Sequence, residues 1–331
     1  MKAIKFFAII AMAAAMITSC SNEDELSQSN YPSDNIIRIT AGVNNAKTRA
    51  EGAAGTPLKN PLSLTVVNKN APKYTYVNQV FSKDENEVWR CSETLLWQNS
   101  ETPVDILAFA PAVDKNPFAN VYNKETRNYS SFSYSVAANQ STESDNNDLL
   151  YYYAPNFKPG ESLKDGKLSI KMNHAFCMID INVTLGTEFN VSGVPTASPI
   201  TEVTLGGTKI TADVNATSTS NIVTASETAA AKDITATKGD FDTPADNDKE
   251  KSCISHFSCI AIPQTVAANT FKVSLMTADK LYEWTSAEPV KLQSGCRYTL
   301  KLSMGNDVVL LKGGITASEW KPGEGGSLET D

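Results

Sequence analysis

The chain has 331 residues and a formal net charge of −8, with 29 basic against 37 acidic residues. No cluster of Lys or Arg interrupts the acidic background. Binding to a phosphate backbone needs the opposite charge, so the composition argues against nucleic acid as a partner. The length is enough for about two domains of ordinary size.

The N-terminus has the features of a lipoprotein export signal. Lys2 and Lys5 precede an apolar run at 6–17 that is too short to span a bilayer, and Cys20 then stands at the position of a lipobox cysteine. Residues 1–20 are therefore predicted to be a signal peptide, with lipid attached to Cys20 after cleavage. The alternative is an ordinary secretory signal in which Cys20 is incidental.

Residues 21–25 are acidic and resemble the surface-export signal of lipoproteins in some Gram-negative anaerobes. This resemblance implies display on the outer membrane, at the cell surface. Residues 21–35 as a whole are polar and lack periodicity, which predicts a flexible tether between the lipid and the folded body.

The first predicted strand follows this tether. Its inward face is expected to carry Ile37, Ile39, Ala41 and Val43, which alternate with polar or small residues. Lys47-Thr48-Arg49-Ala50 and the small residues that follow predict an exposed loop with a basic cleavage site between Arg49 and Ala50.

Further short strands are predicted along most of the chain, and segments with a helical period are scarce. Residues 104–110 (VDILAFA) are apolar at nearly every position, as in a strand that is covered on both faces. From Leu168 onward, apolar residues alternate with polar ones, and the phase of this alternation changes near Met178. This change suggests a β-bulge or a bend in the strand. Residues 215–251 are rich in Thr, Ser, Ala, Asn and Asp and predict a long exposed excursion.

The fold class predicted from these patterns is all-β, with two tandem antiparallel β-sandwich domains at 36–165 and 166–331. Five cysteines remain besides Cys20. Their odd number does not indicate a disulfide framework, and most are expected to be buried thiols, although one bridge stays open among Cys91, Cys177, Cys253, Cys259 and Cys296.

Signals for catalysis or metal binding are weak. The chain has no G-x-S-x-G, P-loop, H-E-x-x-H or G-x-G-x-x-G motif, so we predict no enzyme and no cofactor. His174 is in register with an apolar strand face, which favours a hydrogen-bonded core histidine. His256 lies between Cys253 and Cys259, but on an extended strand its ring points away from both thiols, which argues against zinc.

Two other patterns have competing interpretations. The acidic run 240–250 lacks the central glycine and the bidentate glutamate of a calcium loop, so a solvated loop is favoured. Exposed tyrosines, among them Tyr151, Tyr152 and Tyr153, are suited to stacking on sugars, yet aromatic-rich strands more often belong to a core or a sheet surface.

Several segments together resemble the fimbrillin family of Gram-negative anaerobes, which includes major and minor fimbrial subunits and Mfa-like proteins. These segments cover most of the chain in the family's usual order: the lipobox and residues 36–50, 104–111, 168–183, 262–264, 295–302 and 315–320. The resemblance implies two transthyretin-like sandwiches, export as a lipoprotein, and cleavage by an arginine-directed protease. The matching bond is Arg49-Ala50, although a protease-sensitive loop without a role would look the same.

Such a cut would remove the first strand together with the lipid and open an apolar groove, which a neighbouring subunit can fill with a strand of its own. Because donor and groove are different surfaces, the contact generates a fibre. The candidate donor lies within 308–320 and comprises Val308, Val309, Leu310, Leu311 and Ile315. The same residues can instead close the second sandwich, which would place the subunit at a tip.

The leading hypothesis is therefore a non-enzymatic fimbrial subunit that contributes to cell adhesion. Its expected partners are other fimbrillin subunits, the outer membrane through the lipid on Cys20 before cleavage, and a host receptor or glycan. The alternative is a monomeric outer-membrane lipoprotein that binds glycan or host protein and keeps its first strand.

Overall fold

The computed structural model describes residues 30–44, 56–58, 60–112, 117–142, 148–218, 222–305 and 308–320. The predictions for Cys20, for Arg49 and Ala50, and for residues 21–29 lie outside this part of the chain. Within the described part the fold is all-β, as predicted. Its helical turns are α1 (Pro159–Ser162) and the 3₁₀ segments η1 (Pro72–Tyr74), η2 (Pro117–Asn120) and η3 (Thr187–Asn190). No helix among the described residues is both long and apolar enough to cross a membrane.

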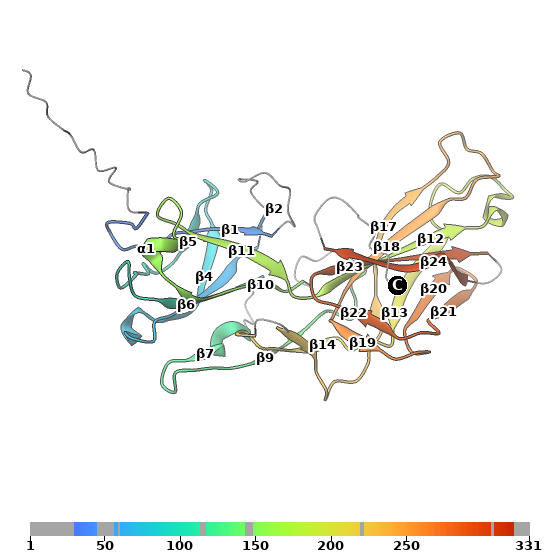
Figure 1. Cartoon of the computed structure of the whole chain (residues 1–331). Coiled ribbons are helices and arrows are strands. Elements are labelled where there is room, and N and C mark those ends of the chain that lie inside the picture. Colours follow the sequence, from blue (N-terminus) through green and yellow to red (C-terminus); the bar gives the residue numbers. More distant parts are fainter. Residues whose placement is uncertain are drawn as a thin grey trace, which may run out of the picture.

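An eight-stranded sheet forms the first lobe of the molecule (Figure 1). Its strands lie in the order β2-β1-β11-β10-β6-β3-β4-β5. Their bounds are β1 Ile39–Val43, β2 Thr56–Pro57, β3 Leu62–Val67, β4 Tyr76–Lys83, β5 Trp89–Cys91, β6 Val104–Ala110, β10 Leu150–Phe157 and β11 Leu168–His174. β1 pairs in parallel with β11, whereas β11, β10, β6, β3, β4 and β5 pair antiparallel with one another.

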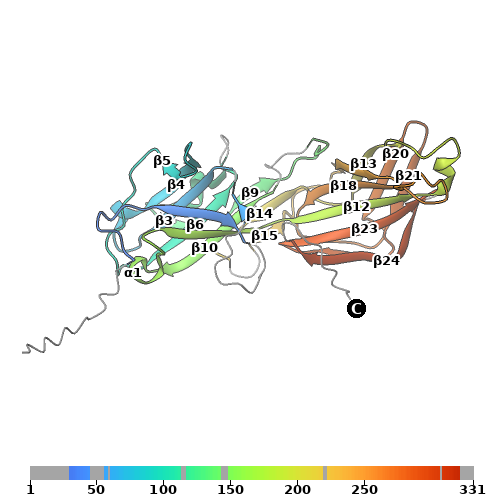
Figure 2. The same cartoon turned by 90° about the horizontal axis from the view of Figure 1, so that it is seen from above.

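The second lobe holds a five-stranded sheet, β17-β18-β12-β23-β24, and a four-stranded sheet, β16-β13-β20-β21 (Figures 1 and 2). Buried residues of both sheets, such as Ile181 on β12 and Leu205 on β13, belong to one core, so the two sheets form a sandwich. The bounds are β12 Cys177–Leu185, β13 Ile200–Gly206, β16 Ile234–Thr235, β17 Thr237–Asp242, β18 Ile254–Ala261, β20 Lys272–Thr277, β21 Leu281–Thr285, β23 Cys296–Met304 and β24 Val308–Glu319.

Three smaller sheets complete the described fold: β15-β14-β9, β19-β22 and β7-β8. In the first of them β9 pairs antiparallel with β14, so an early segment and a late segment of the chain share a sheet. The bounds are β7 Tyr122–Asn123, β8 Asn128–Tyr129, β9 Phe132–Ser135, β14 Thr211–Val214, β15 Val223–Ala225, β19 Gln264–Val266 and β22 Val290–Leu292.

The chain passes between the lobes later than the boundary predicted at 165–166. β11 lies between β1 and β10 in the eight-stranded sheet, and β12 is the first strand of the five-stranded sheet. The buried residues Ala175 and Phe176 connect them. The phase change near Met178 therefore reflects the passage from one sheet to another, in place of a bulge within one strand.

Residues 215–251 are not the long exposed excursion that their composition suggested. They contribute β15, β16 and β17, and the larger core includes five of their buried side chains, Ala216, Ile222, Val223, Ile234 and Ala236. Thr and Ala dominate this segment, and a β-branched Thr fits a pleated, half-buried surface, so the polar composition did not reveal the strands.

β6 is covered on both faces, as predicted, because it separates two hydrophobic cores. Ile106 and Ala108 belong to the smaller core, which β1 and β11 also line. Leu107 and Phe109 belong to the larger core, which continues into the second lobe, and Phe109 stacks on Phe118 with ring centroids 4.8 Å apart.

Candidate assembly site

The first strand predicted from the sequence is β1, which lies between β11 and the short β2. Ile37, Ile39 and Val43 are buried, and Ala41 is half-buried against the same smaller core, whereas the intervening Thr40 is exposed. This alternation arises because successive strand residues point to opposite faces of the sheet. The structure thus brings all four predicted residues to one side of β1.

Backbone pairing holds both edges of β1. Five residue pairs join it to β11, from Ile39 opposite Leu168 to Val43 opposite Met172, and two pairs join it to β2. Just beyond the strand, the amide of Asn44 donates to the carbonyl of Met172 at 2.6 Å. Loss of β1 would leave the edge of β11 unpaired, and such an edge is a template for another strand.

A second segment, Leu95–Trp97, holds the residues just before β1. The amide of Ile37 donates to the carbonyl of Leu95, and the amide of Trp97 donates to the carbonyl of Asn35, both at 2.8 Å. The side chains of Leu95 and Trp97 are themselves buried in the smaller core. The slot that β1 occupies is therefore bordered by this segment as well as by β11.

Electrostatic contacts contribute little to the retention of β1. Arg38 forms a two-pronged ion pair with Asp34, at 2.9 and 2.5 Å, and its hydrogen bonds lower the pKa of Asp34 to about 2. Both side chains are 44% exposed, and ion pairs of this kind are screened by water. Apolar burial and backbone pairing therefore dominate at this strand.

The candidate donor strand is β24, at the edge of the five-stranded sheet. It pairs antiparallel with β23 over two stretches, Cys296–Leu300 and Leu302–Met304, which an irregularity separates. Ile315 and Ala317 pack against the larger core. In this structure the segment thus closes its own sheet, which is the second of the two arrangements considered from the sequence.

The end of β24 is attached to the first lobe by an aromatic contact. The ring of Trp320 stacks on that of His174 in β11 with centroids 3.8 Å apart, and the Trp320 amide donates to the carbonyl of Gly295 at 2.8 Å. His174 Nδ1 lies 2.6 Å from Oδ2 of Asp148, and this hydrogen bond fixes the imidazole ring. β11 therefore contacts both β1 and the end of β24.

The family model for fimbrillin-like proteins matches residues 48–320. The chain belongs to the fimbrillin-like family. The resemblance noted from the sequence is confirmed, and this membership identifies a structural protein and not an enzyme, as predicted.

Two solved structures share the fold of this fimbrillin-like protein. A candidate cell adhesion protein of Bacteroides uniformis is 14% identical, with a TM-score of 0.56, and the match covers 88% of this chain and 100% of that one. A second candidate cell adhesion protein, from Bacteroides ovatus, is 16% identical, with a TM-score of 0.60 and coverage of 87% and 99%. Identities this low establish a common fold alone. Among curated proteins none matches the chain.

The other candidate residues of the fimbrillin-like chain have structural contacts. His256 places its two ring nitrogens 2.9 Å from Asn182 Oδ1 and 2.8 Å from Asp242 Oδ2. Cys253 and Cys259 are buried free thiols, and the described residues contain no group of three His, Cys, Asp or Glu side chains able to hold a metal ion. Among the other described cysteines, Cys91, Cys177 and Cys296 also form no disulfide.

Three features of the site were missed in the sequence. No local sequence pattern links Leu95–Trp97 to the residues before β1. No local sequence pattern predicts the stacking of Trp320 on His174. None predicts the side-chain hydrogen bond from Asn44 Nδ2 to Asn173 Oδ1, at 3.0 Å. Each contact joins residues far apart in the sequence, so only the fold brings them together.

Proposed function

We propose that this chain is a fimbrial subunit that contributes to cell adhesion, and that it assembles by strand exchange at the slot of β1 after cleavage at Arg49-Ala50. Family membership and a fold shared with two candidate cell adhesion proteins support the first part. Export as a lipoprotein through Cys20 belongs to the same proposal and is supported by the sequence of residues 1–25.

The position of β1 carries the second part of the proposal. Arg49 and Ala50 lie in the sequence between β1 and β2, so a cut there leaves β1 joined to the protein by non-covalent contacts alone. Burial of Ile37, Ile39 and Val43 contributes roughly 1.5 to 3 kcal/mol each, or about 5 to 9 kcal/mol before ordering costs. A donor strand that offers the same burial can replace β1.

β24 is the proposed donor. It has a hydrogen-bonded partner strand, β23, on one side only, because it lies at the edge of its sheet. Donation requires β24 to leave β23, and Trp320 to leave its stack on His174. A subunit that keeps β24 in place would accept a strand without offering one, so the same geometry accounts for a tip subunit. The alternative monomeric lipoprotein would retain β1 permanently.

The experiment compares cleavage with strand exchange in cells that express the full chain. Arg49→Ala is expected to keep the tether attached and to abolish polymers, whereas the control Lys47→Ala is expected to be cleaved and to assemble. The N-terminal residue of the surface protein and the polymer ladder on gels are the measurements. Normal polymers from Arg49→Ala would rule out this bond as the trigger.

A disulfide lock separates exchange from cleavage. Thr40 and Ser169 are partners in the β1–β11 ladder, and Thr40 is exposed, so the pair Thr40→Cys and Ser169→Cys is expected to fasten β1 with little effect on the core. The oxidised double variant should be cut but remain monomeric, and reduction should restore assembly. Each single variant serves as a control for unwanted pairing with native thiols. Polymers from the locked protein would contradict strand exchange.

A further inference from the structure

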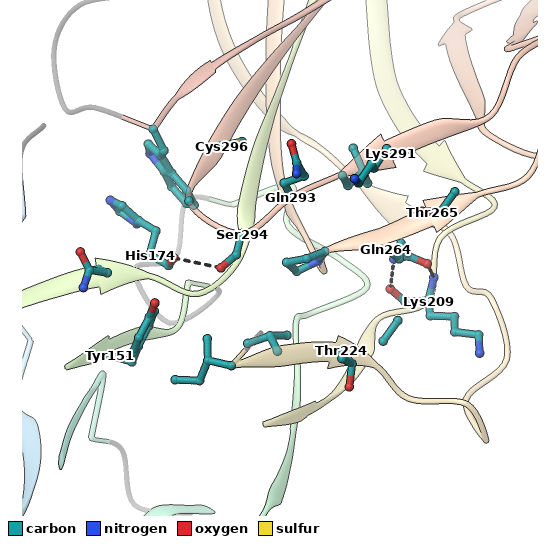
Figure 3. A pocket seen from close by; sticks show the side chains of 18 of the residues that line it. Tyr151, His174, Lys209, Thr224, Gln264, Thr265, Lys291, Gln293, Ser294 and Cys296 are labelled. Atoms are coloured by element: carbon teal, nitrogen blue, oxygen red, sulfur yellow. Dashed lines mark hydrogen bonds between the residues drawn. The ribbon is translucent and has the colours of Figure 1, made fainter. Parts of the chain in front are cut away.

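An open cavity of about 1050 Å³ lies where the two lobes meet (Figure 3). Its walls come from β10 and β11 of the first lobe, from β15 of the small β15-β14-β9 sheet, and from β19, β22, the start of β23 and Trp320. This volume is just above the range of roughly 300 to 1,000 Å³ that is typical of small-ligand sites. The cavity is distinct from the slot of β1, although Asn44, just after β1, lies on its rim.

One end of this cavity is aromatic. Figure 3 shows Tyr151 and His174 at this end, both half-buried, and the ring of Trp320 that stacks on His174 also lines the cavity. Flat aromatic surfaces pack well against the apolar C–H face of a sugar ring. This end can therefore hold one ring of a saccharide.

Neutral polar side chains form a further part of the cavity lining. Asn44, Thr224, Thr265 and Gln293 line the cavity and are exposed. Amides and hydroxyls both donate and accept hydrogen bonds, as the hydroxyl groups of a sugar also do. Such a wall suits a ligand with many hydroxyls better than it suits an apolar one.

The opposite end is cationic. Lys209 and Lys291 lie there in Figure 3, and no Asp or Glu is among the described residues that line the cavity. Nζ of Lys209 donates to the carbonyls of Ser226 and Glu227 at 2.8 and 3.2 Å, which leaves one of its three protons for a ligand. Lys291 is exposed and forms no ion pair with a described residue. A positive end in a protein of net charge −8 favours an anionic group there.

We propose that this cavity binds an acidic saccharide, with a sugar ring on the aromatic end and a carboxylate at Lys291. An acidic peptide would also meet the lysines, but it would leave the aromatic end and the neutral polar wall without a purpose. The inference deepens the adhesive part of the proposed function and rests on it. Donation of β24 would remove Trp320 from the cavity, so saccharide binding belongs to a subunit that keeps β24 in place, such as a tip subunit. Binding is measured on the unassembled chain, so assembly and saccharide binding can fail separately.

The test is calorimetric titration of the full chain with three probes: sialyllactose, lactose and triglutamate. We expect sialyllactose to bind at least about tenfold more tightly than lactose, since a hydrogen bond to a charged group adds about that factor. Triglutamate should not bind measurably. Lys291→Ala should lower the affinity for sialyllactose about tenfold, and Lys291→Arg should retain it.

Lys301→Ala is the matched control, because Lys301 is an exposed lysine on β23 that does not line the cavity. It should bind sialyllactose like the unaltered chain. The proposal is overturned if sialyllactose does not bind, if lactose or triglutamate binds equally well, or if Lys291→Ala and Lys301→Ala behave alike. Thermal unfolding of each variant verifies that its fold is intact.

Discussion

At the scale of single residues, Asp105 shows how the first lobe accommodates a charge. Its side chain is only 3% exposed, yet Lys69 Nζ lies 2.7 Å away, the hydroxyl of Tyr129 donates to it at 2.5 Å, and the amide of Asn156 donates at 2.9 Å. A buried carboxylate is tolerated when partners of this kind replace water.

These partners determine the direction of the pKa shift of Asp105. Burial by itself raises this pKa, but the hydrogen bonds from Lys69, Tyr129 and Asn156 outweigh it, so the pKa is lowered. A carboxyl whose pKa is lower in the folded state stabilises the protein above its unfolded pKa. This stabilisation is lost as the pH falls through the folded value.

We therefore expect Asp105→Asn to lower the free energy of unfolding by about 1 to 3 kcal/mol at neutral pH, and Tyr129→Phe to lower it by about 1 kcal/mol. Lys69 is 60% exposed, so its own loss of a partner adds little. Urea unfolding measures both variants. The difference between Asp105→Asn and the unaltered chain should shrink as the pH falls to about 3. A difference that does not change with pH would contradict this account.

At the scale of elements, the attachment of β24 to its sheet depends on contacts at the end of the strand. It has a partner strand on one side only, and its pairing with β23 is interrupted between Leu300 and Leu302. The stack of Trp320 on His174 attaches this strand to the other lobe. Edge strands with few neighbours open more readily than central ones, so this contact is expected to control how easily β24 is released.

Trp320→Ala should accelerate hydrogen exchange at the amides of 315–319 by about tenfold, because aromatic stacking contributes about 0.5 to 1.5 kcal/mol and further burial is lost with it. Exchange in β1 should not change. Trp320→Phe keeps an aromatic face and should retain most of the protection. Mass spectrometry measures the exchange. Equal hydrogen-exchange rates at the β24 amides of Trp320→Ala and of the unaltered chain would disprove the role of the stack.

At the scale of the whole molecule, the two lobes are not independent halves of the sequence. β11 lies in the first lobe although it follows the predicted boundary, and β9 from the first half pairs with β14 from the second. The larger core also includes Leu107 and Phe109 of β6 together with residues of the second lobe. A cut at the predicted boundary would therefore divide sheets and a core.

We expect a fragment of residues 30–165 to lack a cooperative urea transition, because β1 and β10 both lose β11. A fragment of residues 30–176 restores β11 and should recover part of the structure, although β9 still lacks β14. Circular dichroism during urea titration distinguishes the two fragments. A transition for 30–165 as sharp as that of the full chain would contradict this interpretation.

The sequence alone determined the fold class, the family and the inward face of β1. Alternation of Ile37, Ile39, Ala41 and Val43 is a local pattern, since side chains of a strand point alternately to its two faces. The uninterrupted apolar run of β6 is local too, and it correctly indicated burial on both faces.

Only the tertiary structure decided which strands are neighbours. The pairing of β1 with β11, the stack of Trp320 on His174 and the cavity between the lobes all join segments far apart in the chain. Hydrophobic periodicity reports which face of a strand is buried, but not against which partner, because burial is non-directional and many strands offer similar apolar faces. The predicted boundary at 165–166 and the expected excursion at 215–251 failed for this reason.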